Sequence, residues 1–118
     1  MTWMLLIVEP PDQRQSRSEA EARDLYDRML RFGDELERRG LLLGSGSLAS
    51  HQQAARVSRN DGQVRVMDGP FAEAKEMIGG YYLLDCASHG EAVALAGECP
   101  AAEWCTVEVR RLAPCHEG

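Results

Sequence analysis

Two strand-length runs of apolar residues constrain the fold of this chain more than any other feature. The first run is Trp3 to Val8, and the second lies within Met77 to Cys86 and begins near the pair Gly79-Gly80. Each run is apolar at consecutive positions, so both faces of the strand carry apolar side chains. Such a strand must be covered on both faces, which predicts two central strands of a sheet.

Each apolar run is followed by the start signal of a helix. The segments Ser18-Glu-Ala-Glu21 and Ser88-His-Gly-Glu91 have the form of a capping box, in which Ser and Glu side chains satisfy free amides of the first turn. Apolar residues then recur at helical spacing as far as Gly40 in the first case and Cys99 in the second. Pro100 ends the second helix. The sequence therefore predicts two helices, one after each central strand.

A β-hairpin is predicted between the two helices. Asp61-Gly62 lies between two alternating segments and suits a two-residue hairpin turn. This register pairs Val57 with Val66. The period of two puts Asp68 on the same face as Val66, and we expect this face to point inward. The predicted segments are Ala55 to Arg59 and Gln63 to Met67.

The order of elements predicts an α+β fold. Two further strands are expected at Leu41 to Leu48, which is glycine-rich and bent, and at Trp104 to Leu112. The result is a ferredoxin-like βαββαβ arrangement with an extra β-hairpin and an antiparallel sheet that carries both helices on one face. The bare apolar face is most simply covered by a second copy, so we expect a face-to-face homodimer with a small-molecule cavity between the sheets.

The length and net charge of the chain limit its number of domains and the kinds of partner that it can bind. The 118 residues predict a single domain over residues 1–113 and a short C-terminal tail over 114–118. A net charge of −6 argues against direct binding to nucleic acid or to an anionic membrane. The first apolar run is too short for a signal peptide or a membrane span, so we expect a cytoplasmic protein.

No cofactor or metal is expected from the residue patterns. The four cysteines form no CxxC pair, and in a non-secreted chain we expect them to be reduced. The spacing of Cys86 and His89 from the other cysteines matches no regular zinc-ligand pattern. The glycine-rich segment at residues 44–46 has no following lysine and does not lead into a helix start, so it does not predict nucleotide binding.

The segment after the hairpin carries a family resemblance. Asp68-Gly69-Pro70-Phe71-Ala72-Glu73, followed by Lys75-Glu76 and Gly79-Gly80-Tyr81-Tyr82, resembles the signature of the DGPF group of YCII-related proteins, and the similarity runs from Met4 to Leu112. The resemblance implies a dimeric α+β barrel, a bacterial source and, for many members, gene neighbours that encode extracytoplasmic-function sigma factors. Few members have an assigned reaction, and the enzymatic relatives include chloromuconolactone dehalogenases. Because one fold hosts many functions, the reactions of these relatives extend to this chain only by analogy.

The chain departs from the family pattern at one functional point. Simpler YCII members are similar to each other in a His within the first helix and an Asp-Pro after the second, which have been proposed as an acid–base pair. Met29 and Cys99 stand at those places here. Neither side chain can reproduce the pair, so the resemblance does not bring that mechanism to this chain.

The acidic segment supplies the candidate catalytic residues. Asp68 is a candidate general base at a strand end, and the alternative is a turn carboxylate that accepts backbone hydrogen bonds. Lys75 would bind an anionic substrate while Glu73 or Glu76 moves a proton, and the alternative is an exposed loop of ion pairs.

A second set of residues is assigned to ligand contact, each with a structural alternative. Phe71 also suits packing of its own loop. Gly80, with Gly79, also suits a close approach of the backbone to the second helix, and Tyr82 also suits an ordinary interface tyrosine. The full set of candidate ligand contacts is Ser47, Gly69, Phe71, Gly80 and Tyr82.

Two functional hypotheses follow. The first is a homodimer that binds a small molecule and has a regulatory role in association with a sigma factor of the extracytoplasmic-function type. The second is a lyase-like or isomerase-like enzyme that acts on a small anionic organic acid by proton transfer, with Asp68 as base and Lys75 as anion partner. The first is favoured because the acid–base pair of simpler relatives is missing.

Overall fold

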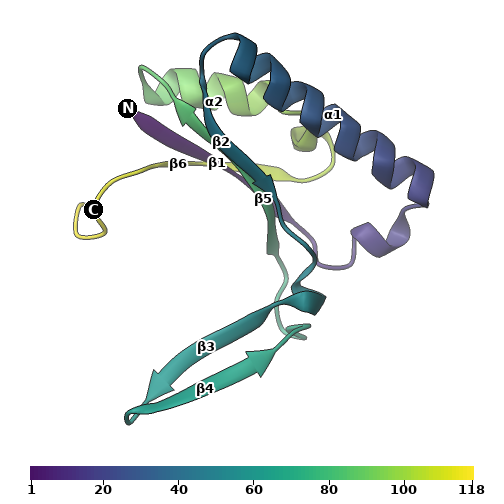
Figure 1. Cartoon of the computed structure of the whole chain (residues 1–118), viewed down its shortest axis with the longest axis vertical. Helices are drawn as coiled ribbons and strands as arrows, with labels where there is room; N and C mark the ends of the chain where they lie inside the picture. The colour runs from purple at the N-terminus through teal and green to yellow at the C-terminus, as the bar shows by residue number, and fades with distance from the viewer.

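The computed structural model describes residues 1–118 and contains six strands, two α-helices and three short 3-10 helices (Figure 1). The strands are β1 (Thr2–Glu9), β2 (Leu42–Ser47), β3 (Ala55–Asn60), β4 (Gln63–Asp68), β5 (Met77–Asp85) and β6 (Thr106–Arg111). The helices are α1 (Glu19–Arg38) and α2 (His89–Glu98), and the 3-10 helices are η1 (Arg14–Ser16), η2 (His51–Gln53) and η3 (Pro100–Glu103).

The main sheet has four antiparallel strands in the order β2-β5-β1-β6. The two apolar runs therefore form the two central strands, β1 and β5, as predicted. Both helices lie on one side of this sheet (Figure 1). The α+β, ferredoxin-like prediction is confirmed, with β3 and β4 as the additional hairpin between β2 and β5.

The helix ends are formed by the residues that the sequence indicated. The Ser18 side chain accepts a hydrogen bond from the Glu21 amide at 3.1 Å, and the Ser88 side chain accepts one from the Glu91 amide at 3.2 Å. After α1, Gly40 adopts a φ of +73°, which a residue without a Cβ tolerates best. No helix of the protein combines the length and hydrophobicity needed to cross a membrane.

The hydrophobic core lies between the helices and one face of the sheet. In β1 the odd-numbered side chains Trp3, Leu5 and Ile7 are buried on this face, as the alternation of a strand requires. They belong to a cluster completed by Phe32, Leu36, Tyr82, Leu84, Cys86, Ala92, Leu95, Ala96, Cys99 and Ala101. One face of each central strand is thus covered within the chain.

The opposite face of the sheet has no helix over it. On this face Met4 lies opposite Leu83 and Leu6 lies opposite Tyr81. All four side chains are half-buried rather than buried. The prediction of a bare apolar face is therefore met by a continuous patch across β1 and β5, which we call the bare face.

The hairpin of β3 and β4, which we call the arm, extends away from the main sheet (Figure 1). Asp61 and Gly62 have φ values of 51° and 76°, which form its two-residue turn, and Val57 lies opposite Val66 as predicted. The radius of gyration is 16.1 Å. A compact domain of this length would have about 13.5 Å, so the arm makes the molecule unusually extended.

One expectation about the arm is wrong for the single chain. Val66 and Asp68 share a face, but that face is exposed rather than directed inward, and every residue of β3 and β4 is exposed. The period of two predicted the shared face correctly. It could not predict whether another part of the chain would lie over it.

Candidate ligand-binding cleft

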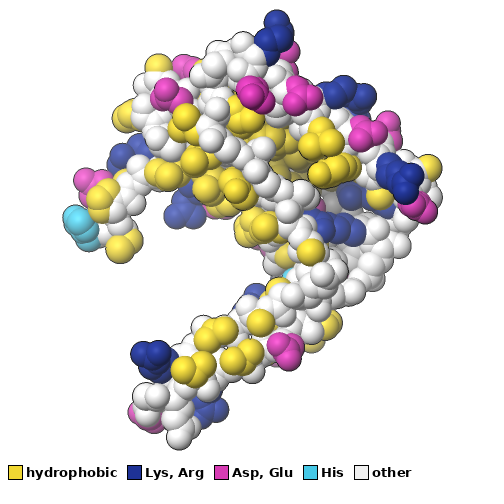
Figure 2. Space-filling model, viewed as in Figure 1, with side chains coloured by type: hydrophobic (Ala, Val, Ile, Leu, Met, Phe, Trp, Pro, Cys, Tyr) yellow, Lys and Arg dark blue, Asp and Glu magenta, His cyan; other side chains and the backbone are white.

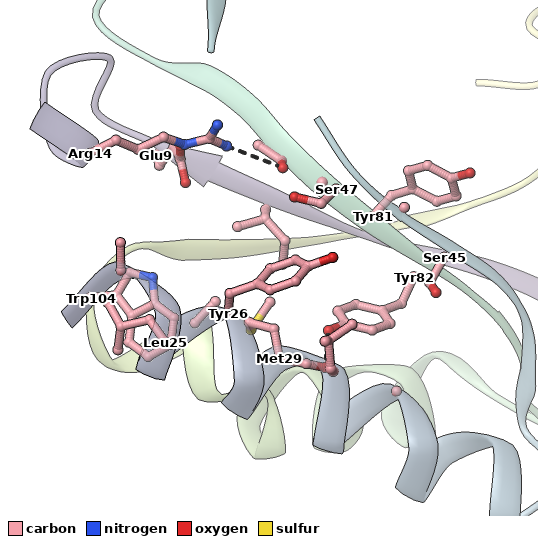
Figure 3. A pocket seen from close by; sticks show the side chains of 18 of the residues that line it. Glu9, Arg14, Leu25, Tyr26, Met29, Ser45, Ser47, Tyr81, Tyr82 and Trp104 are labelled. Carbon is pink, nitrogen blue, oxygen red and sulfur yellow. Dashed lines mark hydrogen bonds and ion pairs between the residues drawn. The ribbon is translucent and has the colours of Figure 1, made fainter. Parts of the chain in front are cut away.

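A cleft of about 470 Å³ lies between α1 and the β2–β5 side of the sheet (Figure 3). We call it the α1 cleft. Half of its lining residues are hydrophobic, and in the close view Tyr26 and Tyr82 project between the helix and the sheet. The labelled lining residues are Glu9, Arg14, Leu25, Tyr26, Met29, Ser45, Ser47, Tyr81, Tyr82 and Trp104.

An ion pair between a buried carboxylate and a half-buried guanidinium forms one end of the α1 cleft. Glu9 is only 5% exposed and is the one charged residue in the buried set. Its carboxylate accepts a hydrogen bond from Arg14 Nε at 2.5 Å. The Arg14 guanidinium also donates to the carbonyls of Leu48, at 2.8 Å, and Gly79, at 3.3 Å. Arg14 therefore holds the loop after β1 against the end of β2 and the start of β5.

The glycine pair of β5 makes this arrangement possible. A Cβ at Gly79 would lie 2.7 Å from Glu9 Oε2, and one at Gly80 would lie 2.8 Å from the Gly46 carbonyl oxygen. Both distances are too short for a side chain. The close neighbours of the pair are thus an ion pair and the backbone of β2, so the expected approach to the second helix is wrong.

The α1 cleft changes in charge along its length. At the Arg14 end, the guanidinium of Arg17 lies 5.9 Å from the centre of the Trp104 ring and forms no hydrogen bond or ion pair. Towards the other end of α1, the lining residues include Asp34 and Glu37. A ligand in the α1 cleft would therefore meet a free cation at one end and carboxylates at the other, with aromatic walls between them.

Tyr82 and Met29 connect the sheet to α1 inside the α1 cleft. The Tyr82 hydroxyl donates a hydrogen bond to the Met29 carbonyl at 2.6 Å. Burial raises the pKa of Tyr82, so the phenol stays protonated and remains a donor. Gly33 gives the ring room, since a Cβ there would lie 3.4 Å from it.

Met29 and Cys99 are brought into contact, with their sulfur atoms 4.0 Å apart. The fold thus places these two positions side by side, as an acid–base pair would require. Burial raises the pKa of the Cys99 thiol, and it raises the pKa of Cys105 to about 11. Protonated thiols are weak nucleophiles, so neither cysteine is activated for chemistry.

The residues predicted to contact a ligand do not all lie in one place in the structure. Ser47, Gly80 and Tyr82 line the α1 cleft, although they were predicted to meet a ligand between two sheets. Tyr81, the neighbour of Tyr82, points to the other side of the sheet (Figure 3). Three candidates from two strands therefore converge on one hollow.

Phe71 lies in a second hollow, of about 530 Å³, where the arm leaves the main sheet. We call it the arm-root hollow. The Phe71 ring is buried beneath the Arg56 guanidinium, 3.9 Å from its centre, and lies edge-on to His51 at 5.7 Å. The predicted packing role of Phe71 matches this position. Gly69 is not among the residues that line this hollow, and a Cβ there would lie 1.8 Å from the His51 carbonyl oxygen.

The candidate catalytic residues surround the arm root without meeting one another. Asp68, Glu73, Lys75 and Glu76 are all exposed. Only Glu76 lines the arm-root hollow, and none of the four takes part in an ion pair. No group of three or more His, Cys, Asp or Glu side chains is placed to hold a metal ion.

The sequence of residues 1–116 matches the family model of the YCII-related domain. The chain belongs to the YCII-related family. An uncharacterised protein of Rhizobium meliloti (strain 1021) is 48% identical to this YCII-related chain over 62 residues, which are 51% of the chain and 50% of that protein. The match therefore spans about half of this curated relative.

Sequence reasoning missed the charged end of the α1 cleft in this YCII-related protein. Glu9 ends the first apolar run and was treated only as its boundary, and Arg14 and Arg17 lie in a segment that was treated as a polar loop. A carboxylate directly after a strand that is apolar on both faces, with an Arg five residues later, is the signal that could have indicated the pair.

Proposed function

We propose that this YCII-related protein binds a small organic molecule with an apolar or aromatic body and an anionic group, and that the α1 cleft is the binding site. The observation that supports the proposal is the pairing of an aromatic-walled cleft of about 470 Å³ with the unpaired Arg17 guanidinium at one end. Such a volume suits a small ligand, and a few placed polar groups in an apolar pocket are typical of ligand sites.

We propose that the α1 cleft binds its ligand without proton transfer at Met29 and Cys99. Met29 has no proton to exchange, and the raised pKa of Cys99 keeps its thiol neutral. The proton-transfer alternative depends instead on Asp68 and Lys75, which are exposed and unpaired in the chain. No specific observation favours that alternative. A homodimer and a regulatory link to a sigma factor remain predictions of the first hypothesis.

The anionic dye 8-anilinonaphthalene-1-sulfonate is a suitable probe, because it combines an aromatic body with one sulfonate. Ser45→Trp would place a large side chain in the α1 cleft from β2, while Ala94→Trp would place the same side chain on the exposed surface of α2. We expect Ser45→Trp to weaken binding at least about tenfold and Ala94→Trp to leave it unchanged. Arg17→Gln should weaken binding about three- to tenfold and remove part of its dependence on salt.

The same variants define the result that would overturn the proposal. If the dye binds the folded Ser45→Trp protein as tightly as wild type, the site is not the α1 cleft. Circular dichroism and thermal unfolding of both Trp variants establish that they are folded. A screen of small cyclic and aromatic acids, with the Ser45→Trp variant as the counter-screen, then narrows the ligand class.

A further inference from the structure

The arm has no partner within its own chain. β3 pairs only with β4, and all twelve of their residues are exposed. A two-stranded hairpin by itself is marginally stable in water, because it buries little apolar surface. An arm of this length therefore needs a surface to lie against.

One face of the arm is suited to such a contact. Ala55, Val57, Val64 and Val66 share this face, and the three valines are 66%, 59% and 62% exposed. We call it the valine face. Arg59 and Asp68 lie on the same face, at its two ends. The other face carries Arg56 opposite Met67, Ser58 opposite Arg65, and Asn60 opposite Gln63. The arm thus has one largely apolar face and one largely polar face, which is the pattern of a hairpin covered on one side.

The bare face is the other apolar surface that lacks cover. It includes Met4, Leu6, Tyr81 and Leu83, which no helix overlies. In the space-filling view, hydrophobic side chains gather along the arm and along the main sheet on both sides of a wide hollow (Figure 2). A single chain leaves that hollow open.

We propose that the arm is exchanged between two copies of this chain, so that the valine face of each copy packs against the body of the other beside paired bare faces. The proposal rests on the homodimer that the sequence predicts, and it does not depend on the ligand proposed for the α1 cleft. The partner is a second copy because each chain carries both the valine face and the bare face. A two-fold axis would bury both faces of both chains at once, with the same patches used on each partner.

The areas agree with this arrangement. Four strands about 4.8 Å apart and six residues long give the bare side of the sheet a flat area of about 400 Å², and one face of the arm adds about 200 Å². Accessible surface exceeds flat area because side chains project. The total approaches the roughly 800 Å² per partner that stable dimers bury, whereas the sheet alone gives about half.

The exchange would also complete the arm-root hollow. Val8 and Ile78 line it from the sheet, and Arg56 lines it from the arm. The Nδ1 atom of His51 is buried there without a hydrogen-bond partner. A second copy seated beside the arm would cover the open side of this hollow.

Sedimentation velocity over a range of concentrations tests the exchange with three variants. Val57→Asp puts a charge on the valine face, Ser58→Asp puts the same charge on the polar face one residue away, and Leu6→Glu puts a charge on the bare face. Because a two-fold dimer contains each change twice, we expect Val57→Asp to raise the dimer dissociation constant about 100-fold. Ser58→Asp should change it less than about threefold, and Leu6→Glu should produce monomers.

Each outcome bears on a different part of the proposal. If Val57→Asp remains as dimeric as wild type while Leu6→Glu is monomeric, arm exchange is wrong but the dimer stands. If wild type is monomeric at every concentration, both are wrong. Hydrogen exchange of the wild-type arm is a measurement independent of variant folding: protection of the β3 and β4 amides should fall at least about tenfold on dilution, and protection that does not change with concentration contradicts the exchange.

Discussion

The α1 cleft and the arm are both open to solvent, yet they are held in very different ways. The α1 cleft is framed by the core, and its buried charge, Glu9, is paired with Arg14 in the same chain. The arm is held by its own backbone ladder and by contacts at its root, and its valine face is exposed. One hollow is therefore complete within the chain, whereas the valine face has no other part of the chain over it.

The strongest test of this comparison removes the charge partner from the α1 cleft. Arg14→Met leaves the Glu9 carboxylate buried without its cation, so we expect the free energy of unfolding to fall by about 3 kcal/mol. Arg23→Met, which breaks the exposed pair of Arg23 with Glu19, should cost less than about 0.5 kcal/mol. Urea unfolding measures both. A loss below about 1 kcal/mol for Arg14→Met would mean that the ion pair does not hold the α1 cleft in place.

The next test acts on the root of the arm. Gly69→Ala would put a methyl group 1.8 Å from the His51 carbonyl oxygen, so the backbone must move, at a cost of about 2–3 kcal/mol. Limited proteolysis should then cut the arm faster, while the main sheet stays intact. Gly44→Ala, where a Cβ meets nothing within 4 Å, is the matched control. Equal cleavage of the two variants would show that the arm root does not determine the position of the arm.

Alkaline pH tests the body of the protein rather than the arm. Burial raises the pKa of Cys105 from 9.0 to about 11, so the unfolded chain loses this proton first as pH rises. Stability should therefore be unaffected below pH 9 and should fall between pH 9 and 11, by about 1–2 kcal/mol for this thiol. Buried Cys99 and Tyr82 act in the same direction.

The control for the pH effect is Cys105→Ala, measured by urea unfolding at pH 8, 9, 10 and 11. This variant should lose stability less steeply than wild type over the same interval. Parallel curves for the two proteins would show that the Cys105 thiol is not desolvated in the folded state.

The smallest expected effect concerns the link between the sheet and α1. Tyr82→Phe removes the hydrogen bond to the Met29 carbonyl and should cost about 1 kcal/mol. Tyr26→Phe, which removes a hydroxyl from an exposed tyrosine in the same cleft, should cost less than about 0.5 kcal/mol. If the two variants are equally stable, the Tyr82 hydroxyl contributes nothing to the position of α1.

The elements that the sequence predicted well are those encoded by a few adjacent residues. The capping serines, the Asp61-Gly62 turn and the Val57–Val66 register all depend on contacts between residues that are close in the sequence. Such signals survive in any fold that contains the element, because their physical cause is local. The central positions of β1 and β5 then follow from the apolar side chains on both faces of each strand.

The candidate site was less predictable because its parts are distant in sequence. Ser47, Gly80 and Tyr82 share the α1 cleft, but they were expected between two sheets. The Gln13 side chain donates a hydrogen bond to the backbone carbonyl of Trp104, a lining residue of the cleft, at 2.6 Å across 91 positions. The residue pattern around either position cannot predict such a contact, because the contact depends on how the whole chain folds.

By itself, the sequence determined the elements, their order and the sheet with one bare face, because hydrophobic period, caps and turns act locally. The tertiary structure decided which side chains share a hollow. It buried Glu9 beside Arg14, placed Met29 against Cys99, and left Asp68 exposed at the root of the arm. Burial and charge pairing depend on what the rest of the chain brings near a residue, and only the folded chain specifies that environment.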